Sequence, residues 1–102
     1  MAVSYTINGI LFKTQKDLRA HLKAMYAFYK NGDSLSKKDF NFVYDLFKHH
    51  EEYKTRIAGG VKDIKLDFSL WKGVKTRCFY IIHDDGTLED FSYENCIKNY
   101  KP

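Results

Sequence analysis

The chain has 102 residues, of which 44% are apolar and 29% are charged, a composition typical of a globular protein rather than a disordered one. This length predicts one domain over residues 1–102 and excludes a repeat array. The formal net charge is +4, but it is unevenly distributed. Residues 1–82 contain fifteen Lys and Arg and eight Asp and Glu, whereas residues 83–102 contain two Lys and five Asp and Glu. A basic body of this kind is typical of proteins that bind phosphates.

The first third of the chain predicts a β-hairpin followed by a helix. Apolar residues, Val3 among them, alternate with polar ones before Asn8 and Gly9. This pair is a strong hairpin signal because both central residues must reach positive φ. Thr14 is expected to cap a helix that stops at Asn31-Gly32. Its apolar face is formed by Leu18, Leu22, Met25 and Tyr29.

The middle of the chain predicts a second helix and then a loop. Ser36 is expected to cap this helix. Its apolar face is formed by Phe40, Val43, Tyr44 and Phe47. The next stretch, residues 53–58, is polar and ends in Gly59-Gly60.

The last third predicts three strands and a short helix. Apolar residues alternate with charged ones over 64–68, Lys72-Gly73 forms a turn, and 77–83 is apolar on both faces. We therefore expect 77–83 to be a central strand that is buried on both faces. Asp85-Gly86 predicts a second hairpin, and Ser92 is expected to cap the last helix. The predicted fold is α+β: an antiparallel sheet of about four or five strands, packed against two main helices, with a short C-terminal helix.

The two cysteines, and the residues at the start of the chain, bear on the compartment in which the protein is expected. Cys78 and Cys96 match no zinc or redox motif, so we expect free, mostly buried thiols. No stretch of about 18 apolar residues is present, and the N-terminal residues resemble neither a signal nor a transit peptide. We therefore expect a cytoplasmic protein, or one that has already been processed, without membrane contact and without a cofactor.

The second half of the chain resembles the DCL (defective chloroplasts and leaves) domain family. The matching motif residues are Arg77, Cys78, Phe79, Asp85, Gly86, Asp90, Phe91, Ser92, Tyr93 and Cys96. Upstream, the match falls on Leu46, His49 or His50, Arg56, Ile57, Ala58 and Gly60, although Glu51, Arg56 and Ala58 replace the family's Pro, Lys and first Gly. The resemblance spans about residues 12–97. It implies proximity to nucleic acid: plant members look linked to plastid ribosomal RNA maturation, the domain ends the largest subunits of the plant polymerases devoted to silencing, and small stand-alone copies resemble bacterial and phage proteins.

The histidines and acids near the second helix raise the possibility of catalysis. A metal-dependent nuclease would want a set such as His49, His50, Glu51 and Glu52 together with His83, Asp84 and Asp85. However, adjacent residues on a helix point about 100° apart, so His49 and His50 are not placed to ligate one metal. Turn and helix-end roles explain the same residues, so we expect no metal site and no enzyme activity.

The basic residues provide the candidate interface. Gly59 and Gly60 can form a backbone concavity for a phosphate beside Lys54, Arg56 and Lys62. The positive surface is extended by Lys65, Lys72 and Lys75. Phe68 and Trp71 lie among these lysines in the sequence, and such a mixture of basic and aromatic side chains suits a single-stranded nucleic acid whose bases stack on the rings. The acidic residues Asp84, Asp85, Glu89, Asp90 and Glu94 are expected to lie away from the phosphates or to contact a basic partner.

The Asp90–Tyr93 segment has a structural explanation. Phe91 packs in the core, Ser92 caps the helix, Asp90 adds charge near the helix N-terminus, and Arg77 is expected to pair with Asp90 across the hairpin. The basic body of the chain, together with what the resemblance to the DCL domain implies, predicts a small, non-enzymatic module that binds nucleic acid, with RNA preferred. The alternative is a protein-interaction module that docks on a polymerase, a ribosome or a nuclease.

Overall fold

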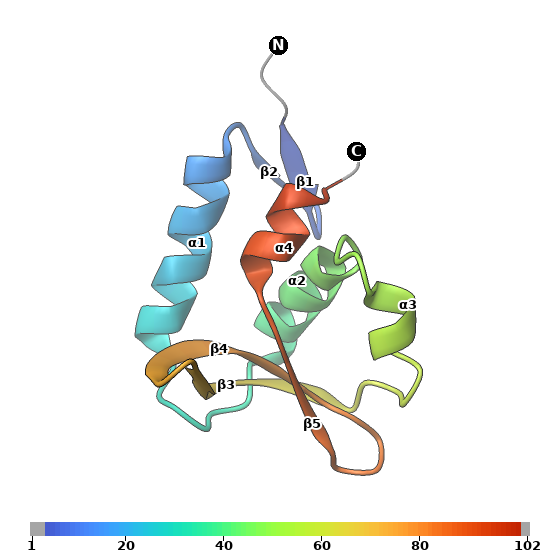
Figure 1. Ribbon diagram of the computed structural model, residues 1–102. Coiled ribbons are helices and arrows are strands. Elements are labelled where there is room, and N and C mark those ends of the chain that lie inside the picture. Colours follow the sequence, from blue (N-terminus) through green and yellow to red (C-terminus); the bar gives the residue numbers. More distant parts are fainter. Residues whose placement is uncertain (1–3, 101–102) are drawn as a thin grey trace.

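The computed structural model describes residues 4–100 (Figure 1). In chain order the elements are β1 (Tyr5–Ile7), β2 (Ile10–Phe12), α1 (Gln15–Phe28), α2 (Lys37–Phe47), α3 (Tyr53–Arg56), β3 (Asp63–Trp71), β4 (Val74–Ile82), β5 (Leu88–Phe91) and α4 (Tyr93–Lys98). The α+β class is confirmed. Val3, which was assigned to the first strand, lies outside the described residues.

The strands form two antiparallel sheets rather than the single one predicted. β1 pairs with β2, and the second sheet has the order β3-β4-β5. In Figure 1 the β1–β2 hairpin lies near the two chain ends, and the three-stranded sheet lies at the opposite end of the molecule. The outer edge of β3 cannot take up β1 or β2, because the segment before α2 already pairs there. Leu35 N–H donates to Ile64 C=O at 2.9 Å, and Leu66 N–H donates to Asp33 C=O at 3.0 Å.

Strand β4 is central, as expected, but it is not buried on both faces. Phe79 and Ile81 are fully buried on the face that the helices cover. Cys78, Tyr80 and Ile82 point to the other face and are only half-buried. The prediction of burial on both faces is wrong because the helices all pack on one side of this sheet (Figure 1).

Local signals placed the helix starts correctly. The side chains of Thr14, Ser36 and Ser92 accept backbone N–H bonds at the starts of α1, α2 and α4. Helix α1 ends earlier than expected, at Phe28, and Tyr29 is its C-cap. The short helix α3 was not predicted, since residues 53–56 show no apolar periodicity.

The two sheets share one core. Its fully buried side chains include Ile7 from the first hairpin, Leu18 and Leu22 from α1, Val43, Leu46 and Phe47 from α2, and Ile64, Leu66, Phe79 and Ile81 from the larger sheet. Cys96 and Ile97 of α4 complete it. Between residues 4 and 100, no helix is long and apolar enough to span a membrane.

Candidate functional site

The Arg56 side chain, one of the predicted phosphate ligands, is turned toward acidic groups. It donates a hydrogen bond to the Asp90 carbonyl on β5 at 2.7 Å. Its guanidinium also lies 3.3 Å from the carboxylate of Glu89 and 3.5 Å from that of Glu52. The expectation that the acidic end lies away from this part of the interface is therefore wrong for Glu89. Lys54, which lies on the same short helix as Arg56, is exposed.

The Gly59–Gly60 loop packs against the turn that follows β4. Asp84 N–H donates to Gly59 C=O at 3.2 Å, and His83 Nδ1 lies 2.7 Å from Gly60 C=O. A Cβ atom at Gly60, whose φ is +78°, would overlap the Asp84 carboxylate. The loop is thus close to a negative charge, which repels phosphate.

His83 lies between two acceptors and is nearly buried. Its Nδ1 contacts Gly60 C=O, and its Nε2 lies 3.0 Å from a Glu89 carboxylate oxygen. These two contacts favour the doubly protonated ring, so the Gly60 carbonyl and then Glu89 raise the pKa of His83.

His50 has the opposite electrostatic setting. Its Nδ1 accepts a hydrogen bond from Glu52 N–H at 3.0 Å, and its ring packs against Phe47 and Phe91. Burial, aided by the nearby Arg56 charge, lowers the pKa of His50. Across residues 4–100, no three His, Cys, Asp or Glu side chains are grouped closely enough to hold a metal ion.

Arg77 joins the larger sheet to the end of α1. Its Nη2 donates to Tyr29 C=O at 2.6 Å, its Nε donates to the Asn31 side chain at 2.9 Å, and its Nη1 donates to Tyr26 C=O. The predicted Arg77–Asp90 pair is therefore wrong. Asp90 lies opposite Tyr80 in the sheet, and its carboxylate accepts a hydrogen bond from Ser69 at 3.2 Å.

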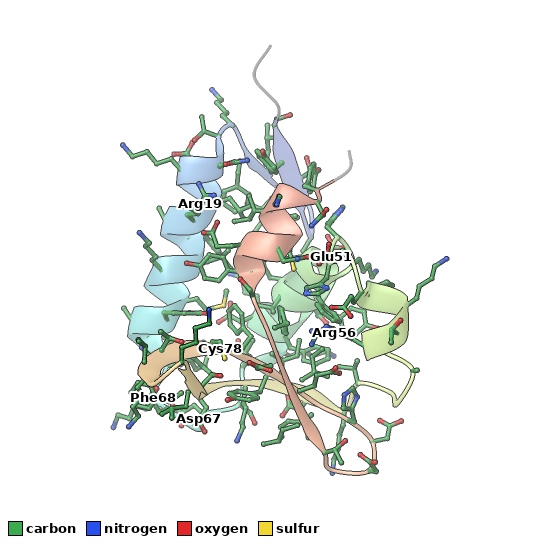
Figure 2. The ribbon with its side chains drawn as sticks, viewed as in Figure 1. Arg19, Glu51, Arg56, Asp67, Phe68 and Cys78 are labelled. Atoms are coloured by element: carbon green, nitrogen blue, oxygen red, sulfur yellow. The ribbon has the colours of Figure 1, made fainter. Side chains whose placement is uncertain are left out.

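Most of the motif residues line one cavity of about 930 Å³ between β4, β5 and the start of α4. Figure 2 shows Glu51 and Arg56 on one side of β5 and Cys78 on the other. The motif residues that line it are His50, Arg56, Arg77, Cys78, Asp90, Phe91, Ser92 and Tyr93. The sequence identified these residues separately but contained no signal that they meet.

The remaining motif residues have structural positions. Asp85 accepts hydrogen bonds from Thr87 N–H and Oγ1, which lower the pKa of its carboxyl, and Gly86 has a φ of +89° in the same turn. The Cys96 thiol is buried in the core, which raises its pKa to about 12. Burial also raises the pKa of the half-buried Cys78 thiol. Both thiols are free, as predicted.

The predicted lysines do not form one patch. Lys62 and Lys72 lie just beyond opposite ends of β3, about 30 Å apart along an extended strand. Lys65, which lies three residues after Lys62, makes an ion pair with Asp67 at 3.5 Å and lies 5.8 Å from the Tyr80 ring. Lys75 lies closer to an aromatic ring, 4.1 Å from the centre of Phe68.

A second group of exposed residues gathers where the β3–β4 hairpin meets the end of α1. Phe68 lies beneath the C-terminal end of α1 in Figure 2 and is opposite Arg77 in the sheet. We name this surface the hairpin-end patch; it comprises Phe28, Lys30, Phe68, Lys72 and Lys75. Leu70 lies beside Lys75 on the same face of the ribbon, whereas Val74 faces the other side with Cys78 and lines the cavity. The Trp71 side chain lies outside what the structure describes.

Sequence analysis missed the exposed apolar residues at and around this patch. Phe28 is 78% exposed, Leu70 is 74% exposed and Val74 is 58% exposed. The exposure of Phe28 was predictable, because this residue lies off the helical face that Leu18, Leu22 and Met25 form. The exposure of Leu70 and Val74 was not, since it depends on how far the hairpin extends beyond the helices, which tertiary packing decides.

The sequence matches known proteins over most of its length. Residues 23–97 match the family described as "Protein of unknown function (DUF3223)". The chain belongs to this family. The relatives of this DUF3223 chain include "Protein DCL homolog, chloroplastic" from Arabidopsis thaliana, at 33% identity over 69% of the chain, so the resemblance to the DCL domain is confirmed.

Other relatives place the same domain in longer proteins. The chain is 34% identical to "DNA-directed RNA polymerase V subunit 1" of Arabidopsis thaliana over 71% of its length, and 31% identical to "Protein EMBRYO DEFECTIVE 514" over 67%. It spans 4% of the first relative, 33% of the second and 32% of the DCL homologue.

A solved structure has the same fold as this DUF3223 chain. The solution NMR structure of an uncharacterized protein from Rhodospirillum rubrum has a TM-score of 0.82 and 31% identity. The match covers 94% of this chain and 89% of the other.

Proposed function

We propose that this DUF3223 protein binds nucleic acid, RNA in preference, through the hairpin-end patch, and that it acts by binding without chemistry of its own. One observation carries the proposal. Lys75 lies 4.1 Å above the exposed ring of Phe68, and in the part of the chain that the structure describes it makes no ion pair. Its charge is therefore available to a phosphate, whereas those of Arg56 and Lys65 are already balanced by carboxylates.

The charge distribution supports the same surface. Lys30, Lys72 and Lys75 are exposed, and all belong to the basic part of the chain before Ile82. Of the acidic residues that follow, Glu89 contacts Arg56 and His83, and Glu94 contacts Arg19. Glu89 and Glu94 are thus engaged at the opposite end of β4 and on α4, away from the hairpin turn, whereas the Asp90 carboxylate accepts a hydrogen bond from Ser69.

The relatives support a role near RNA synthesis or maturation. Two of them, at 34% and 32% identity, are named as subunits of DNA-directed RNA polymerases V and IV. A domain shared with such subunits is well suited to contact nucleic acid or the proteins that process it.

A titration with labelled single-stranded RNA at low and raised salt tests the proposal. Replacing two patch lysines, Lys72→Glu with Lys75→Glu, should weaken binding more than tenfold and reduce the log–log salt slope by about 1.4, because each lost contact removes about 0.7. The matched control is Lys54→Glu with Lys62→Glu, which changes the net charge equally but lies at the other end of β3. Equal losses in the two variants would remove the patch from the proposal, and absence of binding at low salt would end it.

The same titration tests the absence of chemistry. The labelled RNA is expected to stay intact when Mg²⁺ or Mn²⁺ is added. Cleavage that disappears in His50→Ala or His83→Ala would contradict the proposal.

A protein partner is the second candidate function. The exposure of the aliphatic side chains of Leu70 and Val74 favours it, since phosphates and bases gain little from such groups. Leu70→Ser with Val74→Ser should leave RNA affinity within twofold of the parent. A large loss of RNA affinity in this variant would instead assign these residues to the nucleic-acid surface.

A further inference from the structure

The β3–β4 ribbon carries two pairs of lysine and aromatic residues. Lys65 pairs with Tyr80, and Lys75 pairs with Phe68. Because side chains alternate along a strand and Lys65 lies opposite Tyr80 while Phe68 lies opposite Arg77, the two rings face opposite sides of the sheet. The pairs therefore offer an internal comparison of two similar groups in different surroundings.

Carboxylates distinguish the two pairs. Beside Tyr80, Lys65 is bound to Asp67 at 3.5 Å, and Asp90 lies directly opposite Tyr80 on β5. The Tyr80 hydroxyl is also engaged, since it donates to Phe68 C=O at 2.8 Å. On the other side of the sheet, Phe68 has Lys75 over its ring and Arg77 opposite it in the register. The nearby carboxylates of Asp67 and Asp33 accept hydrogen bonds from the backbone N–H groups of Phe68 and Lys30. Among the residues that the structure describes, Lys75 makes no ion pair, and this distinguishes the Phe68 pair from the Tyr80 pair.

The Phe68 ring is accessible to a nucleobase. It is 37% exposed, and Lys75 can move from the ring to a phosphate, since base stacking on an aromatic ring outweighs an exposed cation–π contact. A second ring is available at Phe28, the last residue of α1. It lies in the helical turn that Arg77 binds through the Tyr26 carbonyl. Phe28 is 78% exposed, and its ring makes an edge contact with Tyr29.

We infer that the hairpin-end patch selects single-stranded over double-stranded nucleic acid, with bases stacked on Phe68 and Phe28 and the backbone held by Lys75, Lys72 and Lys30. This inference rests on the proposed function and specifies its substrate class. In a duplex the faces of the bases are already stacked on one another, so the two rings gain nothing from it. The lysines alone would bind either form, with an affinity set by charge and salt.

The test compares a labelled oligouridylate of about 12 nucleotides with an RNA duplex of the same length, in about 50 mM salt. The parent protein should bind the single strand more tightly than the duplex. Phe68→Leu should weaken single-strand binding about tenfold and leave duplex binding unchanged. Phe68→Trp, which keeps an aromatic ring at this position, should bind the single strand as tightly as the parent protein does. Phe28→Ala should weaken single-strand binding about fivefold. The matched control is Tyr80→Leu, which removes the other ring and should change neither affinity more than twofold once its folding has been verified by circular dichroism.

The outcomes separate this inference from the proposed function. If both RNA forms bind equally and Phe68→Leu changes neither, the selection of single strands is refuted, while loss of both affinities in Lys72→Glu/Lys75→Glu would keep the nucleic-acid surface. If neither form binds the parent protein, both conclusions fail. If Tyr80→Leu is as damaging as Phe68→Leu, the base-stacking surface lies on the opposite face of the sheet and the patch is refuted.

Discussion

At the residue scale, His83, Glu89 and Arg56 form a series of polar contacts around the end of β4. His83 lies between the Gly60 carbonyl and Glu89, and Glu89 also contacts Arg56. Arg56 in turn holds the edge of β5 through the Asp90 carbonyl. This series explains why an arginine that sequence analysis assigned to phosphate binding is half-buried: its charge stabilises the junction of α3 and β5.

The raised pKa of His83 makes its contribution to stability depend on pH. A group whose pKa is higher in the folded state stabilises fully below its unfolded value, about 6.5, and this contribution is lost as pH rises through the folded value. The difference in unfolding free energy between the parent and His83→Gln should therefore be larger at about pH 5.5 than at about pH 8. Urea unfolding at the two pH values measures it.

His50 supplies the control for this prediction, because its pKa is lowered and the sign reverses. Its neutral form is the one that the fold favours, so protonation below about pH 6.5 costs stability. The parent should lose stability relative to His50→Gln as the pH falls. A His83 contribution that is constant with pH, or larger at about pH 8, would show that the ring is not charged in the folded protein.

Arg77 has an effect at the element scale, because it supplies a cation that α1 lacks. The last turn of α1 contains no basic residue, and the Arg77 guanidinium from β4 binds the carbonyls there instead. The interaction both satisfies unpaired carbonyls and complements the negative end of the helix dipole. It also orients the β3–β4 hairpin under α1, and so positions the hairpin-end patch.

The replacement Arg77→Lys should destabilise the fold by about 2 kcal/mol, since a single ammonium cannot reproduce hydrogen bonds from three guanidinium nitrogens. Thermal unfolding should show a midpoint about 10 °C lower. Arg19→Lys is the matched control: Arg19 makes a bidentate pair with Glu94, but this pair lies at the surface, and the expected lowering of the unfolding midpoint is much smaller. Similar losses in the two variants would mean that Arg77 acts as an ordinary surface charge.

The edge of β3 is closed by its own neighbours. Beyond the segment that pairs with Ile64 and Leu66, the Phe68 N–H donates to the Asp67 carboxylate at 2.7 Å, and its carbonyl accepts from Tyr80. A partner strand would have to displace these bonds before it could pair there. This edge therefore disfavours strand addition by a protein and leaves the side chains of the patch as the accessible feature.

Elements set by local signals could be predicted, and those set by distant contacts could not. The caps at Thr14, Ser36 and Ser92 and the turn at Asn8-Gly9 depend on residues within four positions, and each was placed correctly. The contacts of Arg77 with α1 and of Arg56 with β5 depend on which elements pack together. The predicted Arg77–Asp90 pair was therefore wrong, and the contact of Arg56 with Glu89 was not predicted. For the candidate site, the sequence supplied the lysines and Phe68, but the division of charge between two ends of β3 required the structure.

At the scale of the whole molecule, Tyr100 connects the first hairpin to the C-terminal region. The Tyr100 hydroxyl accepts a hydrogen bond from Thr6 N–H at 2.9 Å, and its ring packs against Tyr5 and His49. A second contact fixes the same hairpin, since Asn8 N–H donates to the Asp45 carboxylate of α2 at 2.6 Å. Two strands of three residues are not stable alone, so β1 and β2 depend on these contacts with α2 and the C-terminal region.

Truncation of Tyr100 should therefore release the first hairpin before the rest of the fold. Tyr100→Ala should lower the free energy of unfolding by about 2 kcal/mol, because it removes a half-buried ring that packs against Tyr5 and His49. Amide hydrogen exchange should increase more in Tyr5–Phe12 than in β4, whose core side chains Phe79 and Ile81 keep their contacts. Phe28→Ala is the control, since a side chain that is 78% exposed should leave both regions and the unfolding midpoint unchanged. Equal increases in the hairpin and in β4 would show instead that the molecule opens as one unit and that Tyr100 stabilises it as a whole.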